Sequence, residues 1–193
     1  EPSSGSDAAS LRTSAKRSGD KYVINGTKLW VTQGDVAETF ILMARTGEPG
    51  PKGISAFILE KGMPGFRCGK REEKMGCHSS HTMELILENV EVPQRNLVAE
   101  EGMGFKIALT ALNNGRITMG ATALGIARSA LEVALSHSKE RQQFGKPISE
   151  FQGVSFMLSD MAMQLDAARL LVKRAAYLKD AGQNFIKEAA MAK

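Results

Sequence analysis

Residues 30–32, Trp-Val-Thr, stand at the end of an expected strand, and Trp30 is the chain's only tryptophan. An indole beside a hydroxyl suits a planar cofactor with a polar edge, because the ring packs on the cofactor's face while the hydroxyl bonds its edge. A core or sheet-edge aromatic has the same composition. The residues alone leave both interpretations open.

Arg116 and Arg141 are candidates for binding a phosphorylated small molecule, since a guanidinium pairs with two phosphate oxygens at once. The basic residues do not indicate a nucleic acid. The 25 Lys and Arg are interleaved with 21 Asp and Glu, the net charge is +4, and aromatic residues make up only 6%. With no platform for base stacking, we expect no nucleic-acid partner.

Cys77, His78 and His81 form the most metal-like cluster, whereas Cys68 and His137 are isolated. No second Cys or His pair stands at zinc spacing, so we predict no metal site and a polar loop instead. The chain also lacks Gly-x-Ser-x-Gly, a Walker loop and Gly-x-Gly-x-x-Gly. The usual hydrolase and nucleotide-binding folds are therefore unsupported.

Short apolar runs separated by turn residues predict β-strands in the first hundred residues. Residues 21–32 contain Asn25-Gly26, which predicts a hairpin with a type I′ turn. Further strands are expected at 39–46, 54–61 and 82–92. Several short strands with turns between them predict a small sandwich or barrel.

The apolar period changes to that of a helix in the second half, where two stripes begin at Leu124 and Val154. Gly145 and Pro147 interrupt them, which predicts a binding loop over 139–150. Two helices cannot bury both stripes alone, so a bundle with further helices is expected. No apolar run approaches the ~18 residues that span a bilayer. The chain starts without Met and stops inside a helical pattern, so we expect it to be a segment of a longer protein.

Several collinear motifs resemble the acyl-CoA dehydrogenase family of flavoproteins. Residues 1–7 (EPSSGSD) are similar to part of its first signature, and residues 25–32 (NGTKLWVT) to its flavin-side hairpin. Residues 74–84 and 90–93 are similar to the end of its middle domain. Three further segments, together with Gln152, are similar to the start of its C-terminal domain: residues 102–105 (GMGF), 114–116 (NGR) and 141–145 (RQQFG). The matches extend over essentially the whole chain.

The resemblance implies an α+β multidomain protein. Residues 1–98 would form the middle domain, a small antiparallel β-barrel or sandwich on the flavin and acyl-CoA side. Residues 99–193 would form the first helices of an up-down four-helix bundle. The N-terminal helical domain and the rest of the bundle would be missing from this chain.

The resemblance also implies FAD as cofactor and an acyl-CoA as substrate. Trp30 would pack on the isoalloxazine, and Thr32 would hydrogen-bond near its reactive nitrogen. Ser6 would lie near the acyl-CoA or the flavin. Ser80, Asn113 and Arg116 would face the acyl-CoA, although many relatives carry an acid at the position of Asn113. The pyrophosphate and adenine of a neighbouring subunit's FAD would be held by Arg141, Gln143, Phe144 and Gln152, which implies a homo-oligomer, a dimer or tetramer.

The family reaction removes the α-proton of an acyl-CoA with a glutamate while the β-hydride passes to the flavin, which gives trans-2-enoyl-CoA. Electrons then pass to an electron-transfer flavoprotein. In most members that glutamate lies beyond the last residue present here, and in a minority it stands at the position of Gly115. We therefore name no catalytic residue, and we expect the segment alone to be inactive.

Two alternatives stay open. One is an acyl-CoA oxidase, which reoxidises its flavin with oxygen, and the other is a binding protein that keeps the fold without catalysis. Residues 6–10 and 45–55 resemble short branched-chain members such as isobutyryl-CoA dehydrogenase, which implies fatty-acid β-oxidation or branched-chain amino-acid catabolism. The implied location is the cytoplasm of a bacterium or the mitochondrial matrix of a eukaryote.

Overall fold

The computed structural model describes all 193 residues and divides them into two compact units, 1–109 and 110–193, which are described separately. Helix α1 (Gly104–Glu140) begins in the first unit and forms much of the second. The domain boundary expected after residue 98 stays a prediction. No helix combines the length and the apolar character that crossing a membrane requires.

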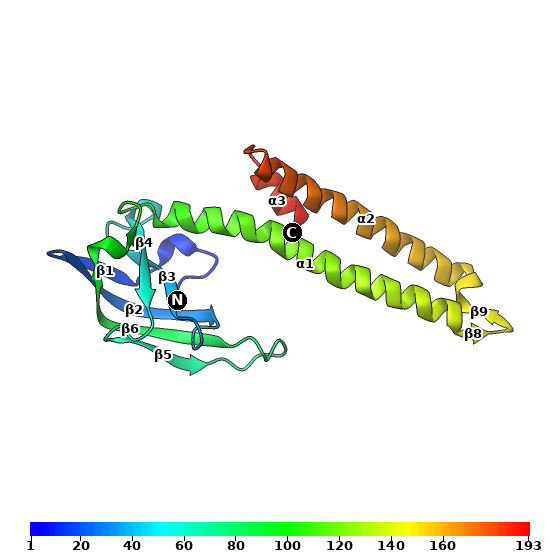
Figure 1. The fold of residues 1–193 in the computed structure, drawn as a ribbon, viewed down its shortest axis with the longest axis horizontal. Helices are drawn as coiled ribbons and strands as arrows, with labels where there is room; N and C mark the ends of the chain where they lie inside the picture. Colours follow the sequence, from blue (N-terminus) through cyan, green and yellow to red (C-terminus); the bar gives the residue numbers. More distant parts are fainter. The chain divides into compact units, whose positions relative to one another are not determined.

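The first unit contains one seven-stranded sheet in the order β5-β6-β2-β1-β3-β4-β7 (Figure 1). Its strands are β1 (Ser14–Ser18), β2 (Lys21–Thr32), β3 (Thr39–Arg45), β4 (Ile54–Glu60), β5 (Phe66–Arg71), β6 (Thr82–Pro93) and β7 (Leu97–Val98). Short 3-10 turns lie at Ala8–Ser10, Pro51–Gly53 and Gln94–Asn96. The strands expected at 39–46, 54–61 and 82–92 are thus present as β3, β4 and β6.

The sheet curls until its two halves face each other across a common core. Phe40 of β3 contacts Phe66 of β5 edge to face, with ring centroids 4.9 Å apart, although β6, β2 and β1 lie between these strands in the sheet. Tyr22 of β2 meets Phe57 of β4 in the same way. The buried core contains residues from five strands, among them Ile24, Leu59, Val90 and Val92.

The expected antiparallel barrel or sandwich is, in detail, an open mixed sheet. β1 and β3 pair in parallel at Ser14 and Arg45, whereas every other pair is antiparallel. The sheet is not closed, since β5 and β7 are its two edges. β5 carries Arg67, Lys70 and Arg71, and such charges discourage an edge strand from pairing further. β7 is too short to extend the sheet.

The hairpin predicted at Asn25-Gly26 is wrong, because β2 continues through both residues. The turn lies earlier, at Gly19 and Asp20, between the paired residues Ser18 and Lys21. Opposite Asn25, β6 carries an extra residue, Asn89, at φ 53°. The amide N–H of Asn89 donates to Asn25 Oδ1 (2.8 Å), and Asn25 Nδ2 donates to Asn89 Oδ1 (3.1 Å). The Asn-Gly pair therefore accommodates a β-bulge and not a turn.

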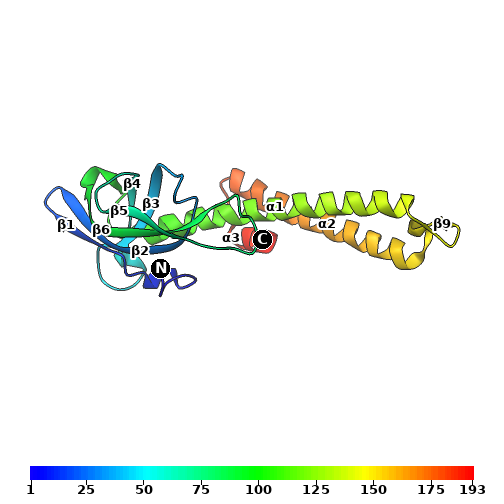
Figure 2. The same ribbon diagram turned by 90° about the horizontal axis from the view of Figure 1, so that it is seen from below.

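The second unit consists of antiparallel helices, with α2 (Gln152–Asp180) lying along α1 and the short α3 (Ile186–Ala192) beside α2 (Figures 1 and 2). Members of both predicted stripes line one hollow between α1 and α2. Leu131, Val172 and Ala175 are buried, whereas Leu135 and Met161 stay exposed. Other apolar side chains stay exposed, including Ile126, Val133, Phe156 and Leu170. The unit is thus the start of a bundle whose outer faces are uncovered.

The loop predicted over 139–150 is present and contains a small hairpin. β8 (Gln142–Gln143) pairs with β9 (Lys146–Pro147), and a 3-10 turn, Ile148–Glu150, leads into α2. The two connecting residues, Phe144 and Gly145, have φ values of 54° and 78°. Two positive φ values in a two-residue loop are typical of a type I′ turn. Gly145 adopts this conformation without strain, whereas Phe144 does not.

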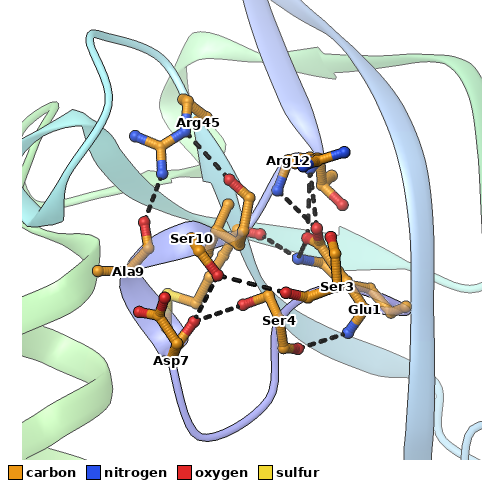
Figure 3. Close-up of polar contacts among 12 residues, drawn as sticks. Glu1, Ser3, Ser4, Asp7, Ala9, Ser10, Arg12 and Arg45 are labelled. Atoms are coloured by element: carbon orange, nitrogen blue, oxygen red, sulfur yellow. Dashed lines mark hydrogen bonds and ion pairs between the residues drawn. The ribbon is translucent and has the colours of Figure 1, made fainter.

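Two charged side chains hold residues 1–13 against β2 and β3 (Figure 3). Arg45 donates to four backbone carbonyls, those of Ala9, Leu11, Glu48 and Gly50, at 2.7–3.1 Å. On the other side, the Glu1 carboxylate accepts from the Arg12 amide and from Lys28 Nζ, both at 2.6 Å. This stretch of irregular backbone thereby becomes a fixed part of the unit.

The Glu1–Lys28 ion pair is buried, with side chains only 5% and 14% exposed. Burial alone would raise the pKa of the Glu1 carboxyl, but hydrogen bonds from Lys28, from the Arg12 amide and from Thr13 lower it from 4.5 to about 2. Burial lowers the pKa of Lys28, and its bond to Glu1 opposes this shift. The carboxylate therefore stabilises the fold in its charged form.

We expect Gly26→Ala to destabilise the first unit. A Cβ at this position, where φ is 154°, would lie 2.8 Å from the Cα of Thr13, so backbone must move. Strain of this kind costs more than about 1 kcal/mol. Gly76→Ala is the matched control, because nothing lies within 4 Å of its Cβ, and we expect a change within about 0.5 kcal/mol. Urea denaturation measures the stability of both variants. Equal losses of stability would contradict the close contact between Gly26 and Thr13.

We expect Glu1→Gln to lower stability at pH 7 by on the order of 3 kcal/mol, because the variant loses the carboxylate and leaves Lys28 buried without its partner. Because the pKa of Glu1 is depressed in the folded state, its contribution is complete above pH 4.5 and is lost as the pH falls towards 2. The wild type should therefore lose more stability than Glu1→Gln between pH 7 and pH 3, as measured by urea midpoints.

Glu91→Gln provides the control for this prediction. Lys21 and Glu91 are also 2.6 Å apart, but their side chains are 39% and 60% exposed. Exposed pairs contribute about 0–1 kcal/mol. If Glu1→Gln behaved like Glu91→Gln, the buried pair would have no special role in anchoring residues 1–13.

Candidate functional site

A second β-bulge places Trp30 on the surface. Lys28 pairs with Leu85 and Val31 with Met83, so β2 carries one residue more than β6 between these pairs. Trp30 lies in this bulge at φ 61°, a value that bulky side chains rarely adopt, and its side chain is 64% exposed. Bulges re-aim side chains and are frequent beside active sites. The core interpretation of Trp30 is therefore excluded, and its ring is available to a ligand.

Thr32 ends β2 beside this tryptophan. It pairs with Thr82 of β6, its side chain is exposed, and its hydroxyl has no hydrogen-bond partner within the protein. Next to it lies an open, largely apolar hollow of about 400 Å³, lined by Thr32, Phe40, Phe66 and Leu85 among others. An exposed indole and a free hydroxyl on one strand end fit the face and the edge of a planar polar ring.

Gln33 and Asp35 fasten the segment that follows Thr32. The Gln33 amide donates to the carbonyl of His81 (2.7 Å), and the Asp35 carboxylate forms a short contact with His81 Nδ1. That hydrogen bond lowers the pKa of the Asp35 carboxyl, with a smaller contribution from the charge of Arg71. Because Asp35 is ionised, it accepts and the imidazole Nδ1–H donates. Sequence reasoning missed this pair, whose members are 46 positions apart.

The two predicted serine contacts lie on loops. Ser6 is exposed in the anchored stretch 1–13, and its hydroxyl has no partner within the protein. Ser80 is half-buried, its carbonyl accepts a hydrogen bond from Lys74 Nζ (2.5 Å), and it lines a polar cavity of about 530 Å³ with Arg71 and His81. No hydrogen bond connects either serine with Trp30 or Thr32.

Asn113 and Arg116 are brought together on α1. Arg116 Nη1 donates to Asn113 Oδ1 at 2.6 Å, across one helical turn. An amide orients the guanidinium without neutralising it, and Arg116 has no carboxylate partner. Its charge therefore remains available to an anionic ligand. The intervening Gly115 is exposed and supplies no acid.

The remaining predicted residues gather around the hairpin between α1 and α2. Phe144 is 94% exposed at the turn, and Arg141 is exposed with no ion-pair partner. Gln143 donates to the carbonyl of Gln142, and Gln152 is the exposed first residue of α2. Phe151 packs against the hairpin, and the centroids of its ring and that of Phe144 are 6.0 Å apart. Lys146 Nζ lies 4.5 Å from the centroid of the Phe151 ring. A free guanidinium beside an exposed aromatic fits a phosphate and a planar base.

No group of three or more His, Cys, Asp or Glu side chains is placed to bind a metal ion. Cys68 and Cys77 are both free and exposed. His81 instead belongs to the pair with Asp35.

Two family models match the chain. Residues 1–90 match the model described as acyl-CoA dehydrogenase, middle domain, and residues 102–193 the one described as acyl-CoA dehydrogenase, C-terminal domain. A protein of Bacillus subtilis named acyl-CoA dehydrogenase is 53% identical over 194 residues, which cover all of this chain and 51% of that relative.

Solved structures agree with the fold. Butyryl-CoA dehydrogenase from Megasphaera elsdenii superposes with a TM-score of 0.95 at 50% identity, covering 100% of this chain and 51% of that one. A chain in a structure described as the electron transferring flavoprotein of Acidaminococcus fermentans gives 0.94 at 54% identity, with the same coverage.

The chain spans about half the length of the relatives that it matches. The two matched domain models follow each other along it and leave only residues 91–101 unmatched. Their order, together with a shared fold at half identity over the full chain, shows that this chain belongs to the acyl-CoA dehydrogenase family.

Proposed function

We propose that this chain is part of an FAD-dependent acyl-CoA dehydrogenase, which oxidises an acyl-CoA to the trans-2-enoyl-CoA and passes the electrons to an electron-transfer flavoprotein. The observation that carries the proposal is the bulge at Trp30, which exposes a strained indole beside the free hydroxyl of Thr32 in a chain of this family. The flavoprotein acceptor is supported by the similar chain in the Acidaminococcus fermentans structure.

The residues on β2 fit an isoalloxazine. Trp30 would pack against its face, and the Thr32 hydroxyl would donate to its polar edge. FAD, when bound, supplies the acceptor for the hydride that leaves the β-carbon of the substrate. The α-proton requires a base, and since Gly115 has no side chain, we assign that role to no residue of this chain.

The acyl-CoA would be held by Ser6, Ser80, Asn113 and Arg116. Arg116 offers an uncompensated positive charge, oriented by Asn113, to the pantetheine and nucleotide end of the thioester. Ser6 offers a free hydroxyl on a loop that Arg45 and the Glu1–Lys28 pair hold in place. A fixed loop matters here, because a contact to substrate helps only if its position is set in advance.

The outward-facing hairpin favours a homo-oligomer, a dimer or a tetramer. Arg141, Gln143, Phe144 and Gln152 would contact the pyrophosphate and adenine of an FAD bound to a neighbouring subunit. The exposed apolar side chains of α1 and α2 also favour burial against further helices. They include Ile126, Val133, Phe156 and Leu170.

A short acyl chain of about four carbons, straight or branched, is the proposed substrate class. The butyryl-CoA dehydrogenase of Megasphaera elsdenii and the loop resemblance at residues 45–55 both favour it. Such an enzyme would serve fatty-acid β-oxidation or branched-chain amino-acid catabolism, in the cytoplasm of a bacterium or the mitochondrial matrix of a eukaryote.

An anaerobic absorbance titration of the full-length protein tests this function. We expect butyryl-CoA or isobutyryl-CoA to bleach the oxidised flavin band, and octanoyl-CoA to bleach it less. Reoxidation by an electron-transfer flavoprotein should outpace reoxidation by oxygen; the reverse order would make the protein an oxidase. Bound flavin that no thioester bleaches would overturn the substrate class, and a protein without flavin would be a binding protein.

Arg141→Ala in the full-length protein should lower the affinity for FAD about tenfold or more, because a guanidinium–diphosphate contact is lost. The loss should appear without dissociation of the oligomer, measured by equilibrium titration of the apoprotein and by sedimentation. Arg128→Ala is the control, since Arg128 is also an exposed arginine of the second unit but pairs with Glu132 at 2.7 Å. Equal affinities of the two variants would remove Arg141 from the FAD site.

A further inference from the structure

The end of β2 is held in an unfavourable conformation. Trp30 and Gln33, which flank residues 31 and 32, have φ values of 61° and 55°. Each left-handed non-glycine residue costs about 1 kcal/mol or more, and such residues persist only where the surrounding structure fixes them. The site proposed for the flavin is built on this segment, so it depends on the contacts that fix the segment.

One histidine holds the segment in two ways. The carbonyl of His81 accepts the Gln33 amide at 2.7 Å, and the imidazole Nδ1–H donates to the carboxylate of Asp35. His81 directly precedes Thr82, the partner of Thr32 in the β2–β6 pair. The two contacts thus fasten the segment just after Thr32 to the first residues of β6.

We propose that Asp35 and His81 are positioning residues for the flavin: by tying residues 33–35 to the start of β6, they hold the Trp30 ring and the Thr32 hydroxyl in the orientation that binds it. This inference rests on the proposed function. Neither side chain need touch the flavin, since the pair acts through the backbone of β2 and both side chains are only about 30% exposed.

The surroundings leave the Asp35 carboxylate dependent on this histidine. Its other oxygen, Oδ1, is buried and has no hydrogen-bond partner. Lys61 Nζ contacts the backbone carbonyl of Asp35 and pairs with Glu38, so it does not replace His81. The other charged or titratable groups around His81 line the polar cavity beside it: Arg71, Glu72, Glu73, Lys74 and His78.

The test uses the full-length protein and measures the FAD affinity of the apoprotein, the visible flavin spectrum and apoprotein thermal unfolding. We expect His81→Ala and Asp35→Ala each to weaken FAD binding about tenfold and to shift the flavin spectrum. The double variant should lose no more than either single one, because the two residues act as one unit. His78→Ala is the matched control, an exposed histidine in the same loop, and should bind FAD as the wild type does.

A conservative variant separates positioning from general stability. His81→Asn keeps an N–H donor close to the position of Nδ1 and should bind FAD within about twofold of the wild type. His81→Phe keeps the ring without the donor and should behave like His81→Ala, which covers the case where the alanine variant does not fold. A lower apoprotein unfolding temperature with wild-type FAD affinity and spectrum would overturn the proposal. If the wild type itself bound no FAD, the proposed function would fail first.

Discussion

The pairing of β2 with β6 is the constraint on which the site depends. Both strands carry an extra residue, Asn89 in β6 and one residue in the Trp30 bulge of β2, and the second shift restores the register that the first displaces. A shift of one residue exchanges the two faces of a strand. Because the bulges compensate, Ile24 and Val90 stay in the core at one end while Thr32 and Thr82 pair normally at the other. The sheet can thus expose Trp30 without losing its core.

Charged side chains satisfy backbone polar groups in the loop of residues 1–13, as strand pairing does in the sheet. Irregular backbone must satisfy its own polar groups, and Arg45 satisfies four carbonyls from two separate turns with one planar group. Glu1 does the same for the amides of Arg12 and Thr13. The hydroxyl of Ser6 is left free on a loop whose neighbouring segments are bound. A loop held in this way is suited to present a ligand contact.

The sequence predicts the strands and helices better than the bulges and the long-range contacts. Alternation and turn residues locate β3, β4 and β6, and helical spacing locates the facing stripes of α1 and α2. The Asn25-Gly26 signal fails because Asn-Gly is compatible with both a turn and the bulge opposite Asn89, and only the contacts with Thr13 and β6 decide between them. The pair of Asp35 and His81 joins residues that only the fold brings together. The exposure of Trp30 follows from the bulge between Lys28 and Val31, which depends on the pairing of β2 with β6.

Two aromatic residues, Trp30 and Phe144, have positive φ values, and both are exposed. Each combines two costs, a strained backbone and an apolar ring that is largely in water. A ligand that covers the rings is a physical reason for both. Under the proposed function, Trp30 faces the flavin of its own subunit and Phe144 the adenine of a neighbour's FAD. Each chain would then carry parts of two different sites, and only the assembled oligomer would complete either one.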